Sequence, residues 1–171
     1  MDTLKTRIRH VPDFPKPGIL FYDVTTLLRD ADGFKLSIDA MSEPYKGAGI
    51  SLVVGIESRG FILGSAVADR IGAGFVPVRK LGKLPAATIR ASYALEYGND
   101  SLEMHRDAVT TGQRVLVVDD LLATGGTASA AVQLVKELGG VVVAVAVLIE
   151  LAGLNGREKL AGEQLHTVLT Y

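Results

Sequence analysis

Five short apolar runs alternate with segments of helical pattern along this chain, and the alternation limits the folds that it can adopt. The apolar runs span residues 52–56, 75–78, 115–118, 141–149 and 167–169. Segments whose apolar side chains recur near helical spacing lie between them, at residues 61–71, 127–138 and 154–160. Continuous apolar strands separated by helices are typical of a mainly parallel sheet that is covered on both faces. The sequence therefore predicts an α/β fold.

Length and composition exclude several classes of protein. The 171 residues suit one domain over residues 1–171, and the run at residues 141–149 is shorter than the roughly 20 residues that cross a bilayer. The net charge of -1 excludes a polycationic surface for nucleic acid or membranes but permits a local basic pocket. The chain has no cysteine, which excludes disulfides and thiolate nucleophiles. The charged N-terminal residues do not resemble a secretory signal, so we expect a cytoplasmic protein.

Two parts of the chain have a weaker pattern. Residues 10–18 contain three prolines, which predicts an extended or turning segment, and residues 32–46 are expected to form a helix interrupted or ended near Pro44. Residues 79–113 form a long, partly irregular insertion, which in a compact chain is more often a functional flap than a packing element. Two short antiparallel strands are expected within it, over residues 88–95 and 102–109.

The segment VLVVDDLLATGGT, residues 115–127, carries the chemistry most clearly. Asp119 and Asp120 come at the carboxyl end of an apolar strand, where open α/β sheets bind ligands, and neighbouring side chains of a strand point in different directions. The next residues supply small hydroxyl side chains and two glycines just before a helix, at Ala123, Thr124, Gly125, Gly126 and Thr127. Glycine lets backbone amides approach an anion, and a helix N-terminus adds unpaired donors. This pattern indicates a phosphate cradle beside an acidic pair.

Two commoner phosphate-binding motifs do not fit the segment. No lysine follows Gly126, which disfavours a P-loop, and no GxGxxG opens a helix after a strand, which disfavours a dinucleotide site. An acidic pair beside a phosphate cradle suits a ligand with vicinal hydroxyls and a terminal phosphate, such as a ribose 5-phosphate. Carboxylates accept hydrogen bonds from hydroxyl groups, whereas amides and threonine hydroxyls donate to phosphate.

Residues 115–127 resemble the 5-phosphoribosyl 1-diphosphate (PRPP) motif of the type I phosphoribosyltransferases. Further segments resemble the adenine phosphoribosyltransferase family, at residues 14–21, 55–61, 78–85, 93–98 and 156–160. The resemblance covers almost the whole chain. It implies the type I phosphoribosyltransferase fold, with a mainly parallel central sheet flanked by helices, an N-terminal hood over about residues 1–35 and a flexible flap over about residues 79–110.

The resemblance also implies a reaction. Members of the family transfer the phosphoribosyl group of PRPP to N9 of adenine, which gives AMP and pyrophosphate in purine salvage, and they require Mg²⁺ and form homodimers. Mg²⁺ is expected to bridge diphosphate and ribose oxygens with few direct protein ligands. Departure of pyrophosphate leaves positive charge on the ribose, so the leaving group needs cations while the ribose needs anchoring.

Roles for individual residues follow from the same resemblance. The acids Asp119 and Asp120 are expected to hold the ribose hydroxyls, and residues 123–127 the 5-phosphate. Pyrophosphate is expected to contact Glu57, Ser58, Arg59, Arg79, Lys80 and Lys83. Glu96 and Tyr97, in the flap, are expected to act in catalysis, with Glu96 relaying the proton that adenine loses. Adenine is expected at Leu20 and Tyr22, and Tyr22 departs from the family pattern, because FYD replaces the frequent FRD.

Alternatives remain at this point. In a second hypothesis the reaction is the same but the base is hypoxanthine, guanine or xanthine. In a third hypothesis the chain is a regulatory protein that senses PRPP without turnover. The basic residues near Lys80 also suit a solvated loop, and residues 157–159 suit a solvated helix surface. The histidines show no metal-ligand spacing and are expected at the surface or facing a partner, at His10, His105 and His166.

Overall fold

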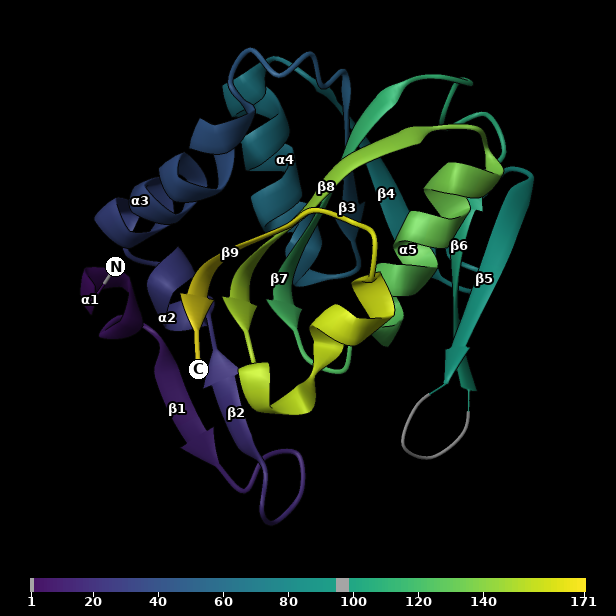
Figure 1. Cartoon of the computed structure of the whole chain (residues 1–171). Coiled ribbons are helices and arrows are strands. Elements are labelled where there is room, and N and C mark those ends of the chain that lie inside the picture. The colour runs from purple at the N-terminus through teal and green to yellow at the C-terminus, as the bar shows by residue number, and fades with distance from the viewer. Residues whose placement is uncertain (1, 95–98) are drawn as a thin grey trace.

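Seven strands form one sheet at the centre of the computed structural model, which describes residues 2–94 and 99–171 (Figure 1). Their order is β5-β6-β4-β3-β7-β8-β9, in which β4, β3, β7, β8 and β9 are parallel and β6 and β5 continue the sheet antiparallel at one edge. The bounds are β3 Leu52–Ile56, β4 Gly74–Lys80, β5 Thr88–Ala94, β6 Asn99–His105, β7 Arg114–Leu122, β8 Val141–Glu150 and β9 Leu165–Thr170. The predicted mainly parallel sheet is confirmed.

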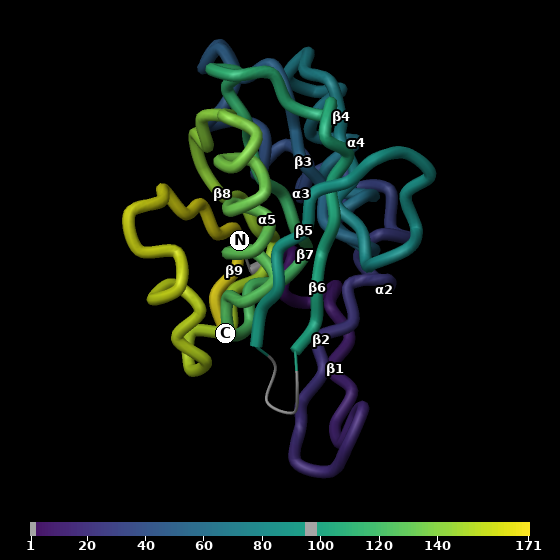
Figure 2. Tube along the Cα trace, turned by 90° about the vertical axis from the view of Figure 1, so that its right-hand side faces the viewer, coloured from purple at the N-terminus to yellow at the C-terminus, as the bar shows by residue number. Residues whose placement is uncertain are grey.

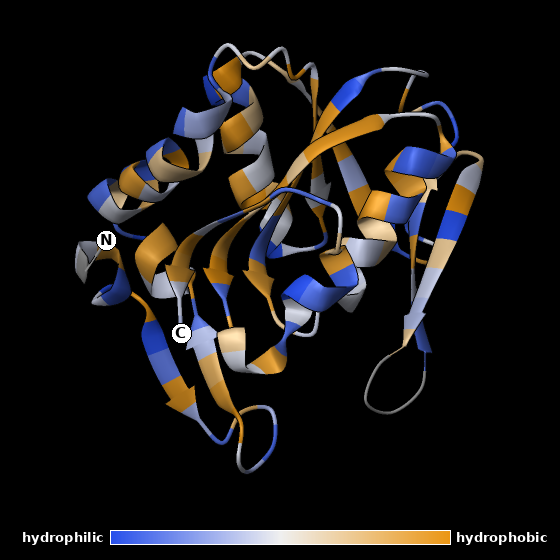
Figure 3. Cartoon of the chain, viewed as in Figure 1, coloured by the Kyte–Doolittle hydropathy of each residue, from blue (hydrophilic) through white to orange (hydrophobic). Residues whose placement is uncertain are grey.

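Helices cover both faces of this sheet. Helices α3 (Ala31–Ser42) and α4 (Arg59–Ile71) pack on one face, and α5 (Gly126–Glu137) packs on the other (Figure 1). Successive residues of β7 alternate between the two faces: Leu116 lies in the core under α4, whereas Val117 lies in the core under α5. Both faces are therefore apolar, which explains why the strands read as unbroken apolar runs. Figure 3 shows hydrophobic residues along the central strands.

A small hairpin precedes the main sheet. The N-terminal elements are α1 (Asp2–Lys5), β1 (Arg9–Pro12), β2 (Leu20–Asp23) and α2 (Thr25–Leu28). Strands β1 and β2 pair antiparallel, so the proline-rich segment that was expected to be extended or turning contains one strand and the connection to the next. Figure 2 shows this hairpin at the same end of the molecule as the paired ends of β5 and β6. That end is also where the parallel strands finish.

Two of the predicted elements differ from the structure, and a third agrees with it. Residues 154–160 do not form one helix, because Asn155 adopts a φ of 53° and separates two 3-10 turns, η2 (Ala152–Leu154) and η3 (Gly156–Leu160). The second flap strand begins earlier than expected, since β6 spans Asn99–His105 and pairs with β5 from Asn99 onwards. Helix α3 ends at Ser42, just before a 3-10 turn that contains Pro44, η1 (Glu43–Tyr45), as predicted.

Within residues 2–94 and 99–171, no helix combines the length and the apolar character needed to cross a membrane.

Candidate active site

The residues predicted to bind PRPP come from three neighbouring strands. Strands β4, β3 and β7 are adjacent and parallel, so their carboxyl ends lie at one edge of the sheet. Glu57 and Ser58 follow β3, and the peptide bond between them is cis. Arg79 and Lys80 end β4, while Asp119 and Asp120 lie in β7. The topology therefore brings together side chains that are more than 60 residues apart in the sequence.

Both acids of the pair are buried, and each has a different hydrogen-bond partner. β7 runs past both acids to Leu122, because its last residues pair with Ile149 and Glu150 of β8. Asp119 Oδ1 accepts a 2.8 Å hydrogen bond from the amide of Asp120, and Asp120 Oδ2 accepts a 2.5 Å bond from Arg59 Nε. Burial, followed by the charge of Asp120, raises the pKa of Asp119 well above the usual range of an aspartate. The two carboxyl groups thus have different electrostatic surroundings.

A glycine lets α4 approach these acids closely. A side chain at Gly60 would place its Cβ 2.8 Å from Asp119 Oδ1 and 3.0 Å from the carbonyl oxygen of Val118. Arg59, the first residue of α4, precedes this contact, and its guanidinium also lies 5.7 Å from the ring centre of Phe21 in β2. Arg59 therefore links the acidic pair to the hairpin.

The predicted phosphate cradle is a tight loop between β7 and α5. Gly125 precedes α5 and has a φ of 79°, which a residue with a side chain adopts only with strain. The first amides of a helix have no intrahelical acceptors and point out of its N-terminus, where they suit an anion. A cavity of about 80 Å³ is lined by Asp119 and by residues 121–128. The loop and the buried acid therefore share one small polar site.

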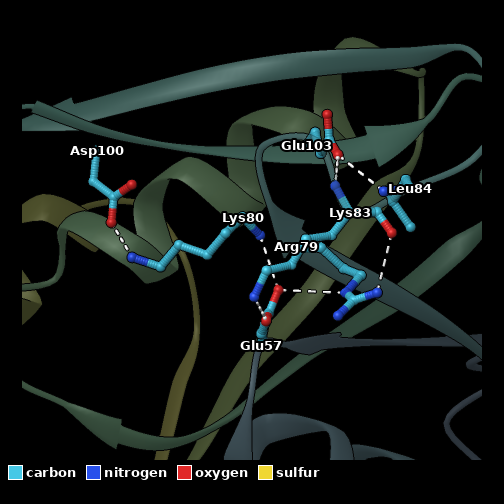
Figure 4. Close-up of polar contacts among 7 residues, drawn as sticks. All are labelled: Glu57, Arg79, Lys80, Lys83, Leu84, Asp100 and Glu103. Carbon is cyan, nitrogen blue, oxygen red and sulfur yellow. Dashed lines mark hydrogen bonds and ion pairs between the residues drawn. The ribbon is translucent and has the colours of Figure 1, made fainter.

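The carboxylate of Glu57 contacts three of the residues predicted to bind pyrophosphate (Figure 4). Glu57 accepts a 3.3 Å bond from Arg79 Nε and a 3.0 Å bond from the amide of Lys80, and it pairs with the ammonium of Lys83. Burial acts to raise the pKa of Glu57, but the hydrogen bonds from Lys83, the Lys80 amide and Arg79 hold it below its ordinary value. The Lys80 ammonium points elsewhere, to Asp100 of β6. These basic residues are therefore not a freely solvated loop.

A second buried carboxylate, which the sequence analysis missed, fixes the turn that carries Lys83. Glu103 is only 2% exposed, and its Oε1 accepts 3.1 Å bonds from the amides of Lys83 and Leu84 (Figure 4). Its Oε2 accepts a 3.3 Å bond from the hydroxyl of Thr88. The only signal in the sequence is a glutamate between two apolar residues, Leu102 and Met104, which is weak by itself.

An apolar cavity adjoins the phosphate cradle. It has a volume of about 720 Å³ and contains both residues predicted to contact adenine, Leu20 and Tyr22, together with Thr124 of the cradle. Its other lining residues were not predicted, and they are Lys16, Gly18, Ile19, Leu151, Gly153, Leu154 and Tyr171. The Tyr22 ring packs against Tyr171, with 4.3 Å between ring centres. The cavity is wide enough for a planar base beside the cradle.

Some predicted residues lie elsewhere. Glu96 and Tyr97 fall outside the residues that the structure describes. His166 is only partly exposed, with its ring centre 5.8 Å from that of Tyr45, and burial lowers its pKa. Arg157 is not merely solvated either, since its guanidinium pairs with Glu150, which is 3% exposed.

Comparison with known proteins defines the class first. The phosphoribosyl transferase domain family matches residues 25–164 of this chain. Together with the parallel sheet, the acidic pair and the glycine loop, this match shows a phosphoribosyltransferase of type I fold.

Individual relatives narrow the family. The adenine phosphoribosyltransferase of Acidobacterium capsulatum is 57% identical over 99% of this chain and 94% of its own length. The crystal structure of the enzyme of that name from Rhodothermus marinus has a TM-score of 0.95 and 56% identity, covering 99% and 97% of the two chains. A Saccharomyces cerevisiae structure, complexed with adenine and an imino-altritol bisphosphate, has a TM-score of 0.94 and 40% identity over 98% and 97%. The chain belongs to the adenine phosphoribosyltransferase family.

Proposed function

We propose that the edge of the sheet formed by β3, β4 and β7 is the active site at which this chain transfers the phosphoribosyl group of PRPP to adenine. The products are AMP and pyrophosphate, and the reaction is a step of purine salvage. The observation that carries this assignment is the junction of three subsites: the buried pair Asp119 and Asp120, the cradle at residues 123–127, and the apolar cavity that contains Leu20 and Tyr22.

The subsites suit the parts of PRPP in a fixed order. The 5-phosphate fits the cradle, where amides and hydroxyls of Thr124 and Thr127 donate hydrogen bonds. The ribose hydroxyls lie over Asp119 and Asp120, which accept from them. The diphosphate then extends toward Arg59 and toward Arg79 and Lys83, which pair with Glu57. Lys80 is the fourth cation, and its ammonium pairs with Asp100. Ser58 contributes from the same turn as Glu57.

The chemistry follows from this orientation. The bond between C1 of the ribose and the diphosphate oxygen breaks, a bond from adenine N9 to C1 forms, and N9 loses its proton. Positive charge develops on the ribose while negative charge develops on the leaving group. In this proposal Arg59, Arg79, Lys80 and Lys83 stabilise the leaving group. Glu96 accepts the proton in this proposal, with Tyr97 beside it, and closure of their loop excludes water that would otherwise hydrolyse PRPP.

The acids of the site suit Mg²⁺ that is bound together with the substrate, but they do not form a metal site by themselves. Within residues 2–94 and 99–171, no three acidic, histidine or cysteine side chains gather as a metal cage. Mg²⁺ keeps much of its water and is commonly bound by one or two carboxylates together with substrate phosphates. In this proposal Asp119 and Asp120 are the carboxylates that would hold the ion, because the ribose hydroxyls bind at the same pair. The ion supplies charge neutralisation to the diphosphate when it is bound.

The test measures nucleotide and pyrophosphate formation from PRPP and Mg²⁺ with adenine, hypoxanthine, guanine and xanthine. AMP formed preferentially from adenine, and lost in Asp119→Asn/Asp120→Asn and reduced in Glu96→Ala, is the expected result. Preference for another base would contradict the adenine assignment and would show that the roles given to Leu20 and Tyr22 are wrong. Saturable PRPP binding without turnover of any base would favour a regulatory protein.

A homodimer and a cytoplasmic location are also proposed, on the family resemblance. Sedimentation of the purified chain measures the first, and a monomer at micromolar concentration would contradict it.

A further inference from the structure

The connection from β8 to β9 packs its backbone directly against the phosphate cradle. A side chain at Gly156 would place Cβ 2.3 Å from the carbonyl oxygen of Ala123, and one at Gly125 would place Cβ 2.3 Å from the carbonyl oxygen of Gly156. Both positions thus need glycine, because two backbones meet there without room for a methyl group. The cradle is supported from outside by a segment that is about 30 residues further along the chain.

The same connection forms one wall of the apolar cavity. The amide of Leu151 donates a 2.9 Å bond to the carbonyl of Leu122, at the end of β7, and the amide of Ala152 donates a 2.9 Å bond to the carbonyl of Tyr171. Leu151 and Leu154 line the cavity together with Thr124. A shift of this connection therefore moves the base subsite and the phosphate subsite together.

An ion pair between Arg157 and Glu150 links the connection from β8 to β9 with the end of β8. Glu150, the last residue of β8, accepts from Arg157 Nε and, at 2.6 Å, from Arg157 Nη2. Its Oε2 also accepts a 3.0 Å bond from the hydroxyl of Thr167 in β9. Arg157 is the residue directly after Gly156, and its planar guanidinium matches the carboxylate with two parallel bonds. Glu150 is buried while the Arg157 side chain is about half exposed, so the arginine is the movable partner.

We propose that Arg157 and Glu150 are positioning residues for the reaction: their pairing holds Gly156 against the phosphate cradle and Leu154 in the wall of the base cavity. This inference rests on the proposed function, because the proposed function assigns the 5-phosphate to the cradle and adenine to the cavity. Neither residue touches a reacting atom. Their effect is on the geometry of the amides at residues 124–127 and on the width of the cavity. Small displacements of such supports are known to cost much activity.

The test compares Arg157→Met with two matched variants. Arg157→Met keeps the aliphatic stem and removes the guanidinium, Arg157→Lys restores the charge with a single donor group, and Lys159→Met changes an exposed lysine of the same 3-10 turn. We expect Arg157→Met to raise the KM of both PRPP and adenine by roughly ten-fold, Arg157→Lys to recover part of this loss, and Lys159→Met to match the wild type. Equal KM values in Arg157→Met and Lys159→Met would overturn the inference.

A second measurement separates positioning from stability and from the proposed function. Hydrogen exchange of the amides at residues 123–128 is expected to become faster in Arg157→Met, while exchange in β3, outside the contact, stays unchanged. Uniformly faster exchange would indicate a merely destabilised protein and would contradict the positioning role. If the wild type converts none of the four bases, the proposed function fails, and the exchange pattern alone then decides the inference.

Discussion

Arg59 Nε donates a 2.5 Å hydrogen bond to Asp120 Oδ2, which joins the first residue of α4 to the last part of β7. The two residues have different partners in the proposed function, in which Arg59 binds the diphosphate and Asp120 binds the ribose hydroxyls. If so, bound PRPP competes with this ion pair for both residues, because its diphosphate is a partner for Arg59 and its ribose hydroxyls are partners for Asp120. The same arrangement recurs at Glu57, whose carboxylate already gathers Arg79 and Lys83. Acids within the site thus keep its cations in place.

The first prediction concerns the stability cost of Asp119. Its pKa is raised by burial and by the charge of Asp120, so the folded chain holds the proton more tightly than the unfolded chain does. Its contribution to stability is therefore fully present below the unfolded pKa and is lost as the pH rises through the folded pKa. Asp119→Asn stays neutral at every pH, so it is expected to raise the free energy of unfolding at pH 7. Each kcal/mol gained raises Tm by roughly 2–4 °C for a chain of this size. The same variant is expected to abolish turnover.

Thermal unfolding at pH 7 and pH 4 checks this expectation. The gain shrinks at the lower pH because pH 4 is close to the pKa of about 3.9 of an aspartate in an unfolded chain. The side chain is then protonated in roughly half of the unfolded chains as well as in the folded chain. Asp120→Asn serves as the matched variant, and it is expected to lower Tm because it removes the partner of the half-buried Arg59 guanidinium. A lower Tm in Asp119→Asn at pH 7 would contradict the argument.

The second prediction concerns Glu57, which competes with diphosphate for the same cations. Replacing it with glutamine keeps an acceptor for the Lys80 amide, at 3.0 Å in the structure, and removes a negative charge beside the ligand. We expect Glu57→Gln to tighten product inhibition by pyrophosphate by roughly three- to ten-fold, as for one charge near a protein surface, and to slow product release. Glu43→Gln, which removes the exposed partner of Lys46, is the control. Weaker inhibition in Glu57→Gln would show that orienting the cations outweighs repulsion.

The third prediction concerns Glu103, which anchors the turn that carries Lys83. Burial acts to raise its pKa, but bonds from the amides of Leu84 and Lys83 and from Thr88 hold the pKa below its ordinary value. Its contribution to stability is therefore present at neutral pH and is lost as the pH falls through the folded pKa. Glu103→Gln is expected to raise the KM of PRPP by about ten-fold, a loss of roughly 1.4 kcal/mol, while the KM of adenine stays near the wild-type value.

Thr88→Val is the comparison for this variant, because it removes only the 3.3 Å bond to Oε2 and leaves both amide bonds. Steady-state kinetics with each substrate varied in turn provides the measurement. An equal rise in both KM values would argue for general loosening rather than for a local effect on the diphosphate subsite.

The strongly periodic parts of this fold were predictable, and the site's ion pairs were not. The segment from β7 into α5 could be identified because four apolar residues, two acids and two glycines follow one another in the sequence. The hairpin of β1 and β2 was missed because its strands are four residues long and none of their residues is buried, so no burial pattern marks them. The hydrogen bond from the Lys83 amide to Glu103 depends on the antiparallel contact of β6 with β4, a tertiary contact that the local sequence pattern does not encode.

The connection between β8 and β9 shows the same limit. Its residues 156–160 resembled the family, yet the spacing suggested an ordinary solvated helix. The contact of Gly156 with Gly125 depends on two distant backbones meeting, and only the positive φ of Gly125 and the missing Cβ atoms permit it. A glycine in the sequence signals freedom of the backbone, but not which segment will approach it.

The last prediction concerns Tyr22, where the chain departs from the frequent FRD pattern. The Tyr22 ring lies 4.3 Å from that of Tyr171 and 5.0 Å from that of His10, so it packs the hairpin against the end of β9 while it lines the cavity. Tyr22→Phe retains these ring contacts and is expected to keep the preference for adenine over hypoxanthine, guanine and xanthine. Tyr22→Ala removes them and is expected to lower kcat/KM for adenine by about ten-fold, the scale of one or two aromatic contacts. Because the ring supports the hairpin, the ratios among the four bases should change less than the absolute rates. A change of base preference in Tyr22→Phe would show instead that the phenol itself reads the base.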